Sequence, residues 1–389
     1  MRILVSCQQS EIRHPLPAYD FWREYFVRGL EEAGHETIEI PGVDWAEGLT
    51  YSAGSELETW RELTWQKTVN FIRDESAHRP IDLFLSYLFP NQVDVSAIKE
   101  IQRRGIPCVN FFCDAVREFR EVPSEFAPFA LHWLPDAEAE LIYRNAGLPY
   151  FQSAYPCWVS AEFRNVPQVE TEPPTFIGRT DVLRREMFGR AIEVGADIVL
   201  RGPGWLTEAA WLESSGHSQR SITRKIANQL ALIRTHGIAS LVVKLENRLW
   251  PIRIPAIPES NVRSSVNNTE YVRITREAMV TVGINRVPTW KTPNRRPLYF
   301  TRLRDIEAPM LGACYLTEWT ESVSKLYEVG VEVEVYRTPE ELSEKIKELK
   351  QDPLRRRNMR ERAQRRALND HCMARSVKSI IQRLGLCLS

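Results

Sequence analysis

Residues 304–312 combine a cation, a carboxylate and small residues, which suits recognition of a charged ligand that carries hydroxyl groups. Arg304 and Glu307 are three positions apart where a loop enters an expected helix, so both side chains lie on one face. An arginine binds a phosphate through paired hydrogen bonds, and a carboxylate accepts hydrogen bonds from vicinal hydroxyls. Ala308 and Gly312 allow a ligand to approach the main chain closely. The alternative for Glu307 is an acid held in the first helical turn by the helix dipole.

A second group of candidate residues follows the short apolar run TFI in the C-terminal half. Gly178 and Arg179 come at the end of this expected strand, where Arg179 can bind a diphosphate. Arg184 or Arg185, on the helix that follows, is a second candidate for the same role. The alternative for Arg179 is an ion pair on the surface.

The next expected strand, ADIVLRG, ends in a turn that contains Arg201, Gly202 and Trp205. The indole of Trp205 can stack on a nucleotide base or form a wall of the ligand pocket. The alternative is a tryptophan of the hydrophobic core. The sequence leaves both open.

Apolar runs alternate with amphipathic helical stretches along the chain, which predicts parallel sheets covered by helices on both faces. The stretch PQVETEPP (167–174) has three prolines and no apolar period, so it reads as a linker. We therefore expect a Rossmann-like domain over 1–166 and a second over 175–352. The second carries a helical insertion at 206–258. A helical segment at 353–389 is expected to pack across the junction.

The composition is that of a globular protein and not of a disordered or fibrous one. Hydrophobic residues make up 43% and charged residues 26% of the 389 residues. The start of the chain has neither a signal peptide nor a membrane-spanning run, so we expect a cytoplasmic protein. The seven cysteines show no C-x-x-C spacing and are expected to be reduced thiols.

The charge is balanced overall but divided unevenly. Residues 1–160 carry 14 Lys or Arg against 24 Asp or Glu, and residues 161–389 carry 37 against 27. Zero net charge argues against a general nucleic-acid binder, and a basic half suits an anionic small ligand. The alternative is a chance difference between solvated helix faces.

The motifs of several enzyme classes are absent from the sequence, including the P-loop, G-x-G-x-x-G after the first strand, H-E-x-x-H and G-x-S-x-G. There is also no Asp-x-Asp pair of the kind that clamps a diphosphate through a metal ion. We therefore expect no metal site and no cofactor, with arginines, main-chain amides and a helix N-terminus holding the anion instead.

Three segments resemble the CgeB-like glycosyltransferases, within the larger group of family-1 glycosyltransferase C-terminal domains. The most specific is 304–346, which contains R-x-x-E-A-x-x-x-G, then T-E, then V-Y-x-T-P-E-E-L. Residues 175–205 and 267–286 are similar to the family's segments in the same order. The resemblance implies a GT-B fold, in which two Rossmann-like domains face each other across a cleft. It also implies transfer of a sugar from a nucleoside-diphosphate sugar bound mainly by the C-terminal half.

By this resemblance Glu307 matches the second glutamate of an E-x7-E pattern, the one that holds the ribose. The first glutamate is replaced by Tyr299, which leaves open whether the enzyme retains or inverts the anomeric configuration. Arg179 and Arg304 are expected to stabilise the leaving diphosphate. The whole expected donor-binding set is Gly178, Arg179, Arg184, Arg201, Gly202, Trp205, Arg304, Glu307, Ala308 and Pro309.

The N-terminal half is expected to hold the acceptor, because ligands bind beyond the carboxyl ends of parallel strands. Gln8 and Gln9 follow the first strand, and His14 lies in the loop after them. Asp114 follows the aromatic run NFFC. His14 or Asp114 can act as the base that an inverting enzyme needs, and the alternative for Asp114 is a capping residue. The acceptor can be a glycan, a lipid-linked glycan, a protein or a small molecule.

The insertion at 206–258 is basic and amphipathic, so it can contact a membrane surface; the alternative is a helix packed on its own domain. Two other functions stay open for the chain as a whole. One is a non-catalytic nucleotide- or glycan-binding protein of the same fold. The other is a sugar-nucleotide epimerase.

Overall fold

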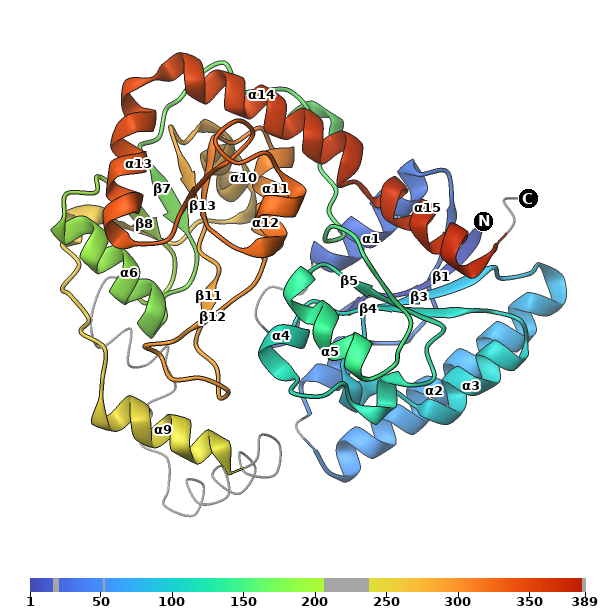
Figure 1. The fold of residues 1–389 in the computed structure, drawn as a ribbon. Coiled ribbons are helices and arrows are strands. Elements are labelled where there is room, and N and C mark those ends of the chain that lie inside the picture. Colours follow the sequence, from blue (N-terminus) through green and yellow to red (C-terminus); the bar gives the residue numbers. More distant parts are fainter. Residues whose placement is uncertain (17–20, 52, 206–237, 387–389) are drawn as a thin grey trace. The chain divides into compact units, whose positions relative to one another are not determined.

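The computed structural model describes residues 1–16, 21–51, 53–205 and 238–386. It divides the chain into two compact units, each of which has its own sheet (Figure 1). Unit 1 consists of Met1–Val159 and Leu368–Ser389, and unit 2 of Ser160–Ala367. Within the described ranges, none of the helices has both the length and the apolar character required to cross a bilayer.

Unit 1 is built on six parallel strands in the order β2-β1-β3-β4-β5-β6. Every residue of β1, β3, β4 and β5 is buried, as expected for strands covered by helices on both faces. Its strands are β1 (Arg2–Ser6), β2 (Glu36–Ile38), β3 (Leu83–Ser86), β4 (Cys108–Phe111), β5 (Leu131–Leu134) and β6 (Tyr150–Gln152). Its helices are α1 (Phe21–Glu32), α2 (Ser55–His78), α3 (Val95–Arg103), α4 (Ala115–Glu118), α5 (Glu140–Asn145) and α15 (Met373–Leu384).

Unit 2 has a second parallel sheet in the order β14-β13-β10-β7-β8-β9 and an antiparallel pair, β11 with β12. Its strands are β7 (Thr175–Ile177), β8 (Val199–Arg201), β9 (Val262–Arg263), β10 (Thr281–Val282), β11 (Arg286–Val287), β12 (Leu298–Tyr299), β13 (Tyr315–Glu318) and β14 (Glu334–Tyr336). Its helices are α6 (Val182–Glu193), α9 (Ala239–Leu249), α10 (Asn268–Glu277), α11 (Arg304–Met310), α12 (Glu321–Leu326) and α13 (Pro339–Gln351), with most of α14 (Pro353–Asp370).

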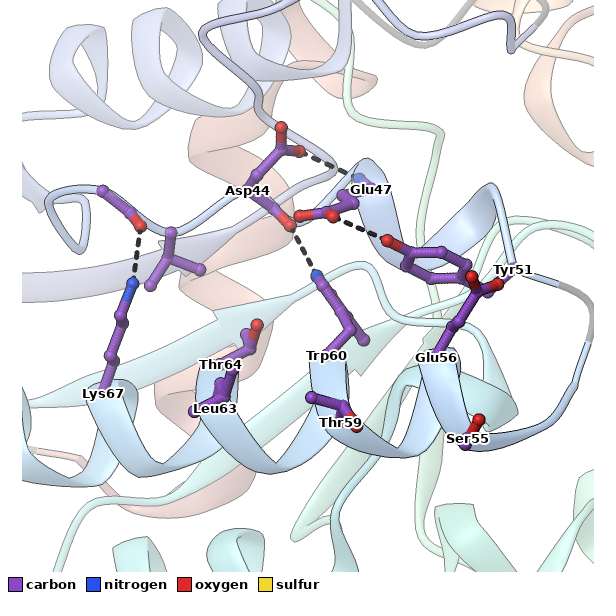
Figure 2. Close-up of a pocket in the computed structure, with 12 residues that line it drawn as sticks. Asp44, Glu47, Tyr51, Ser55, Glu56, Thr59, Trp60, Leu63, Thr64 and Lys67 are labelled. Atoms are coloured by element: carbon purple, nitrogen blue, oxygen red, sulfur yellow. Dashed lines mark hydrogen bonds between the residues drawn. The ribbon is translucent and has the colours of Figure 1, made fainter.

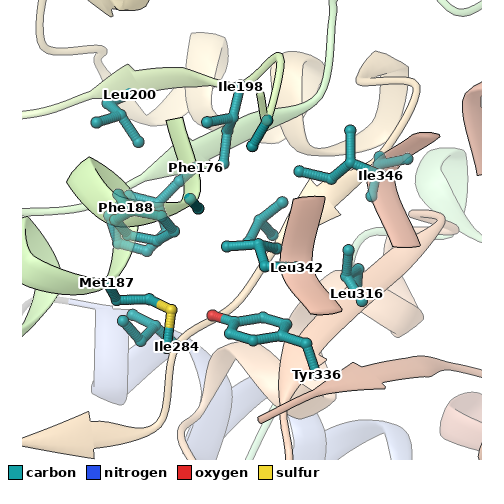
Figure 3. Packing of buried hydrophobic residues seen from close by; sticks show 14 of the residues in the cluster. Phe176, Met187, Phe188, Ile198, Leu200, Ile284, Leu316, Tyr336, Leu342 and Ile346 are labelled. Carbon is teal, nitrogen blue, oxygen red and sulfur yellow. The ribbon is translucent and has the colours of Figure 1, made fainter. Parts of the chain in front are cut away.

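The core of unit 2 joins the sheet to helices α6 and α13 (Figure 3). The rings of Phe176 on β7 and Phe188 on α6 lie 4.7 Å apart between centroids. Leu342 and Ile346 of α13 are fully buried in the same cluster. Burying each such side chain stabilises the fold by roughly 1.5–3 kcal/mol. The core therefore fixes the strand ends from which the candidate site is built.

The stretch expected to be a linker is attached to unit 2 in the structure. The Glu170 carboxylate forms ion pairs with Arg356 at 2.5 Å and with Arg360 at 3.2 Å, both on α14. A carboxylate facing two buried guanidiniums fixes both segments. The described helices of the C-terminal segment are divided between the units. Most of α14 belongs to unit 2, whereas α15 packs on α1 and bonds unit 1 through the Ser376 and Ser153 hydroxyls at 2.7 Å.

Candidate functional site

The turns after β7 and β8 are bonded to each other at the carboxyl end of the unit 2 sheet. The Gly178 amide donates to the Arg201 carbonyl at 2.8 Å, and the Trp205 indole donates to the Gly178 carbonyl at 2.8 Å. Gly202 has a φ of 133°, and a Cβ there would overlap the carbonyl oxygen of Gly178. Only glycine fits both the conformation and the space at this position.

Replacing Gly202 with alanine is expected to lower the free energy of unfolding of unit 2 by roughly 1–3 kcal/mol, because the added methyl group is both strained and crowded. Gly330→Ala is the matched control: Gly330 also has a positive φ, of 84°, but a Cβ there would meet nothing within 4 Å. Urea titration of both variants measures the difference. Equal destabilisation would contradict the packing role of Gly202.

Helix α6 begins at this turn and brings Arg184 to the strand end. The Asp181 carboxylate caps the helix by accepting hydrogen bonds from the amides of Leu183 and Arg184 at 2.9 Å. The Arg184 guanidinium donates to the Arg179 carbonyl at 2.6 Å and lies 5.8 Å from the centroid of the Phe176 ring. Arg179 itself is exposed beside it. The structure thus brings Gly178, Arg179 and Arg184 together.

Helix α11 brings Arg304 and Glu307 to the same end of the sheet. The Arg304 guanidinium lies 5.5 Å from the Phe176 ring centroid and 5.7 Å from the Tyr271 ring centroid. The Tyr271 hydroxyl donates a hydrogen bond to Glu307 Oε2. Burial, followed by the charge of Glu307, raises the pKa of Tyr271, so this hydroxyl stays protonated and donating. Two of the residues that the sequence singles out therefore share one aromatic partner.

A buried carboxylate holds the start of α11 in place. Asp305 is fully buried; its Oδ1 accepts hydrogen bonds from the Tyr315 hydroxyl at 2.8 Å and the Thr317 hydroxyl at 2.9 Å. Its Oδ2 accepts from the Arg302 amide at 2.7 Å. Burial raises the pKa of Asp305, while these hydrogen bonds act to lower it. The network fixes the direction in which Arg304, the residue just before Asp305, enters the site.

Three arginines gather at this strand end: Arg184, Arg302 and Arg304. Burial, opposed by Asp181 and reinforced by the charges of Arg302 and Arg304, lowers the pKa of Arg184 to about 10. Arg302 Nε is buried and has no hydrogen-bond partner among the described residues. Clustered guanidiniums with too few acidic partners favour binding of an anion. The geometry therefore offers a site for a phosphate-bearing ligand.

The remaining residues of the expected donor set pair with or pack against other residues of unit 2. The Arg201 guanidinium pairs with Glu172 at 3.1 Å. Trp205 is buried in the core, with its ring 6.0 Å from Phe188, so it packs against the protein rather than presenting a stacking surface. Ala308 and Pro309 are buried in α11. They shape the helix that carries Glu307.

Sequence reasoning missed Tyr271 and Arg302. Tyr271 lies on α10, more than thirty residues before Glu307, so no local spacing connects the two. Arg302 stands only two residues before Arg304, and its guanidinium lies 4.2 Å from the Phe300 ring centroid. The repeated arginine in the sequence RLR was the available signal.

The position of the missing first glutamate is occupied by the partly exposed ring of Tyr299. The Arg286 guanidinium lies 5.7 Å from its centroid. Glu318, the acid of the T-E pair, is 1% exposed, and its Oε1 pairs with Arg286 Nη2 at 2.6 Å. The Asn285 and Arg286 amides donate to Glu318 Oε2 at 3.1 and 2.9 Å. This buried pair ties the start of β11 to the end of β13.

Unit 1 has a pocket of about 440 Å³ between the loop after β2 and helix α2 (Figure 2). Its lining includes the carboxylates Asp44, Glu47 and Glu56. The Tyr51 hydroxyl donates to Glu47 Oε1 at 2.7 Å, and the Trp60 indole donates to the Asp44 carbonyl at 3.2 Å (Figure 2). Carboxylates beside aromatic rings suit a ligand with several hydroxyls.

His14 lies next to this pocket. Its Nε2 is 2.8 Å from Asp44 Oδ2, so the pocket carboxylate orients the imidazole. Sequence reasoning missed Asp44 and Glu47, although the interleaved acids and aromatics of VDWAEGLTY were a usable signal. Among the candidate residues in unit 1, His14 is the one whose side chain forms a hydrogen bond with a residue that lines the pocket, Asp44.

The other candidates in unit 1 lie at the ends of β1 and β4. Gln8 is buried with a φ of 62°, and its amide nitrogen has no hydrogen-bond partner among the described residues. Gln9 closes the turn after β1 by donating to the Val5 carbonyl at 2.9 Å and accepting from the Cys7 amide at 2.6 Å. Asp114 precedes α4, but its side chain makes no capping hydrogen bond there.

The described residues contain no group of three or more His, Cys, Asp or Glu side chains arranged to hold a metal ion. Six cysteines within the described ranges are free thiols, and five of them are buried.

Comparison with known proteins identifies the family. A family model described as glycosyl transferase-like matches residues 184–382, which is just over half of the chain. No curated protein matches the chain. The family match covers α10, α11 and α13 together with the arginine cluster.

Solved structures with the same fold cover nearly the whole chain. A glycosyltransferase from Rickettsia africae has a TM-score of 0.57 at 10% identity and covers 100% of this chain and 99% of its own. HepE from Anabaena in complex with UDP-glucose has a TM-score of 0.54 at 11% identity and covers 100% of both chains. Sucrose-phosphate synthase from Thermosynechococcus elongatus has a TM-score of 0.54 at 12% identity and covers 99% of this chain and 98% of its own.

At these identities the likeness shows the fold alone. The two parallel six-stranded sheets confirm the predicted α/β fold of the GT-B type. The match to the family model confirms the predicted enzyme class, a glycosyltransferase. The chain belongs to the glycosyl transferase-like family.

Proposed function

We propose that this chain is a CgeB-like glycosyltransferase that moves a sugar from a nucleoside-diphosphate sugar to an acceptor hydroxyl without a metal ion. The observation that carries the proposal is the cluster of Arg184, Arg302 and Arg304 beside Glu307 at the end of the unit 2 sheet. Arginines suit the diphosphate, and the Glu307 carboxylate suits the ribose hydroxyls. The solved complex of Anabaena HepE with UDP-glucose supports a donor of this class.

In the proposed reaction the bond between the anomeric carbon and the diphosphate oxygen breaks, and the acceptor oxygen bonds to that carbon. The negative charge that develops on the departing diphosphate is stabilised by Arg304, Arg184 and the exposed Arg179. The proton of the acceptor hydroxyl passes to a base. His14 is favoured over Asp114 because Asp44 orients its imidazole. The pH dependence of kcat in His14→Gln and Asp114→Asn tests this choice. If His14 is the base, only His14→Gln should lose the fall in kcat at low pH that protonation of the base causes.

The test is a screen of the purified full chain against nucleotide sugars, with thermal stability and release of nucleoside diphosphate as readouts. Stabilisation by one nucleotide series, with release of its diphosphate in the presence of acceptor, supports the proposal. Conversion of the nucleotide sugar without an acceptor would instead make the protein an epimerase. Binding without turnover would make it a non-catalytic member of the fold.

Turnover is expected to survive removal of divalent cations. The proposed cations that neutralise the diphosphate are guanidiniums, so EDTA should leave the rate of diphosphate release unchanged within a factor of about two. The rate is measured in EDTA and again after Mg²⁺ or Mn²⁺ is restored. A loss of turnover in EDTA that either ion reverses would contradict the metal-independent mechanism.

The pocket of unit 1 is proposed to receive the acceptor. Glu56 is exposed at the first turn of α2 and lines the pocket, so Glu56→Ala is expected to raise the KM for acceptor about tenfold by removing a charged hydrogen-bond acceptor. Glu58→Ala is the matched control, because Glu58 is exposed on the same helix but does not line the pocket. An unchanged acceptor KM in Glu56→Ala, or an equal rise in Glu58→Ala, would contradict this placement.

A further inference from the structure

Helix α9 of unit 2 carries a row of exposed apolar side chains. Ile238 at its N-cap, with Val242, Leu245 and Leu249, follows the spacing four, three, four. At about 100° per residue this spacing places all four on one face of a helix. Their exposed fractions are 73%, 55%, 55% and 57%. We call these four residues the α9 stripe.

The opposite face of α9 attaches the helix to unit 2. Ser240 and Val243 are its buried residues. Asn247, on the same face, accepts a hydrogen bond at 2.8 Å from the amide of Asn294, in the loop between β11 and β12. Figure 1 shows α9 beside this loop, away from the six-stranded sheet. The α9 stripe therefore points away from the body to which the helix is fixed.

Two tryptophans extend the apolar surface near the stripe. Trp250 follows α9 directly and is 55% exposed, and Trp290 in the β11–β12 loop is 47% exposed. The Arg295 guanidinium lies 5.2 Å from the Trp250 ring centroid. Tryptophan and arginine side chains placed in this way are typical of the boundary between water and lipid.

The charge around the stripe is positive, although the chain as a whole is neutral. Exposed cations lie on α9, shortly after it and in the β11–β12 loop: Lys244, Arg248, Arg253, Arg295 and Arg296. The carboxylates that pair with members of this set are Glu246, which faces Arg295 at 3.3 Å and Arg296 at 3.5 Å, and Glu193, which faces Arg253 at 2.8 Å. Five cations against two carboxylates leave a net positive surface.

We propose that the α9 stripe and its surrounding cations dock unit 2 on an anionic lipid surface. The apolar side chains enter the region between headgroups and acyl chains, and the lysine and arginine side chains contact anionic headgroups. A nucleic acid would match the charge, but it would leave the apolar row in water. A lipid surface is the partner that matches both features.

The test is co-sedimentation of the full chain with vesicles of phosphatidylcholine alone or mixed with phosphatidylglycerol. We expect binding to the mixed vesicles that weakens as salt is raised, and little binding to phosphatidylcholine alone. The stripe variant Val242→Glu/Leu245→Glu should lower the partition coefficient at least about tenfold. Leu354→Glu is the matched control, because Leu354 is 69% exposed on α14 of the same unit.

A second variant separates charge from apolar contact. Lys244→Glu/Arg248→Glu should bind the mixed vesicles at least about tenfold more weakly and should lose most of the salt dependence. Arg365→Glu, at an exposed position on α14, should bind like the wild type. Circular dichroism and urea unfolding of each variant show whether unit 2 still folds. Because the vesicle assay uses neither donor nor acceptor, its failure is distinct from failure of the proposed sugar transfer.

Three results would overturn the proposal. The first is a wild-type chain that does not bind phosphatidylglycerol vesicles at low salt. The second is a stripe variant that binds them as well as wild type does. The third is a wild-type dimer in analytical ultracentrifugation that the stripe variant loses while vesicle binding is unaffected. The dimer result would assign the stripe to a second copy of this chain.

Discussion

Arg304→Met should lower the rate of donor turnover by a factor of about 10²–10³. In the proposed reaction one further negative charge develops on the diphosphate as the anomeric bond breaks, and removing one preorganised donor from such a site costs about that much in rate. Arg304 is held for this role between the rings of Phe176 and Tyr271. Burial alone would lower the pKa of Arg304, but Tyr271, Tyr315 and the charge of Glu307 raise it, so the side chain stays cationic.

Steady-state release of nucleoside diphosphate measures this effect. Arg304→Lys should recover part of the rate, because it keeps the charge but loses the paired hydrogen bonds of the guanidinium. Arg357→Met is the control for a lost surface arginine, since within the described residues Arg357 forms an ion pair only with Glu361, at 3.1 Å. A variant Arg304→Met that folds normally and turns over like wild type would remove Arg304 from the mechanism.

Glu318→Ala should lower the free energy of unfolding of unit 2 by roughly 3–5 kcal/mol, because it leaves the buried Arg286 guanidinium without its main counter-charge. The same change removes the acceptor of two amides, those of Asn285 and Arg286. Urea unfolding measures the loss. Glu321→Ala is the control, since its ion pair with Lys325 is more than half exposed on both sides and should matter little.

A double variant separates the ion pair from the packing around it. Arg286→Met/Glu318→Met should be more stable than Glu318→Ala, because neither charge is then buried alone. If Glu318→Ala and the control Glu321→Ala were equally stable, the buried pair would not hold β11 to β13.

Sequence patterns identified most strands of both sheets, because strands that are buried on all sides appear as continuous apolar runs. They did not identify β6 or β9, in which only some residues are buried and which do not form an apolar run. Helix α2 was missed for another reason. Its buried residues are spread along 24 positions, eight of which are charged, so the helical period is weak.

The linker composition of PQVETEPP did not indicate the ion pairs that this stretch forms, because acids and prolines have the same sequence signature whether or not they have partners. In the structure Glu170 and Glu172 neutralise arginines that come from distant parts of the chain. Those arginines include Arg356 of α14 and Arg201 of β8. Their partners can be recognised only after the strands and helices are placed.

The candidate site was predictable where a motif was local and was missed where the contact was distant. Arg304 and Glu307 stand within one helical turn, so the sequence displays their relation directly. Tyr271 joins them from another helix. Trp205 illustrates the opposite case, because an aromatic residue after a strand has the same sequence signature whether its ring faces a ligand or the core.

Calorimetric titration of nucleoside diphosphates into the wild type, Arg304→Met and Glu307→Gln tests the central claim most directly. Glu340→Gln is the control, because Glu340 also lies in the first turn of a helix, α13, where it faces Arg190 at 4.0 Å and not the arginine cluster. We predict that one nucleotide series binds the wild type and Glu340→Gln with equal affinity and binds the two site variants at least about tenfold more weakly. Equal affinity in all four proteins, or no binding of any nucleoside diphosphate to the wild type, would contradict a donor site at the arginine cluster.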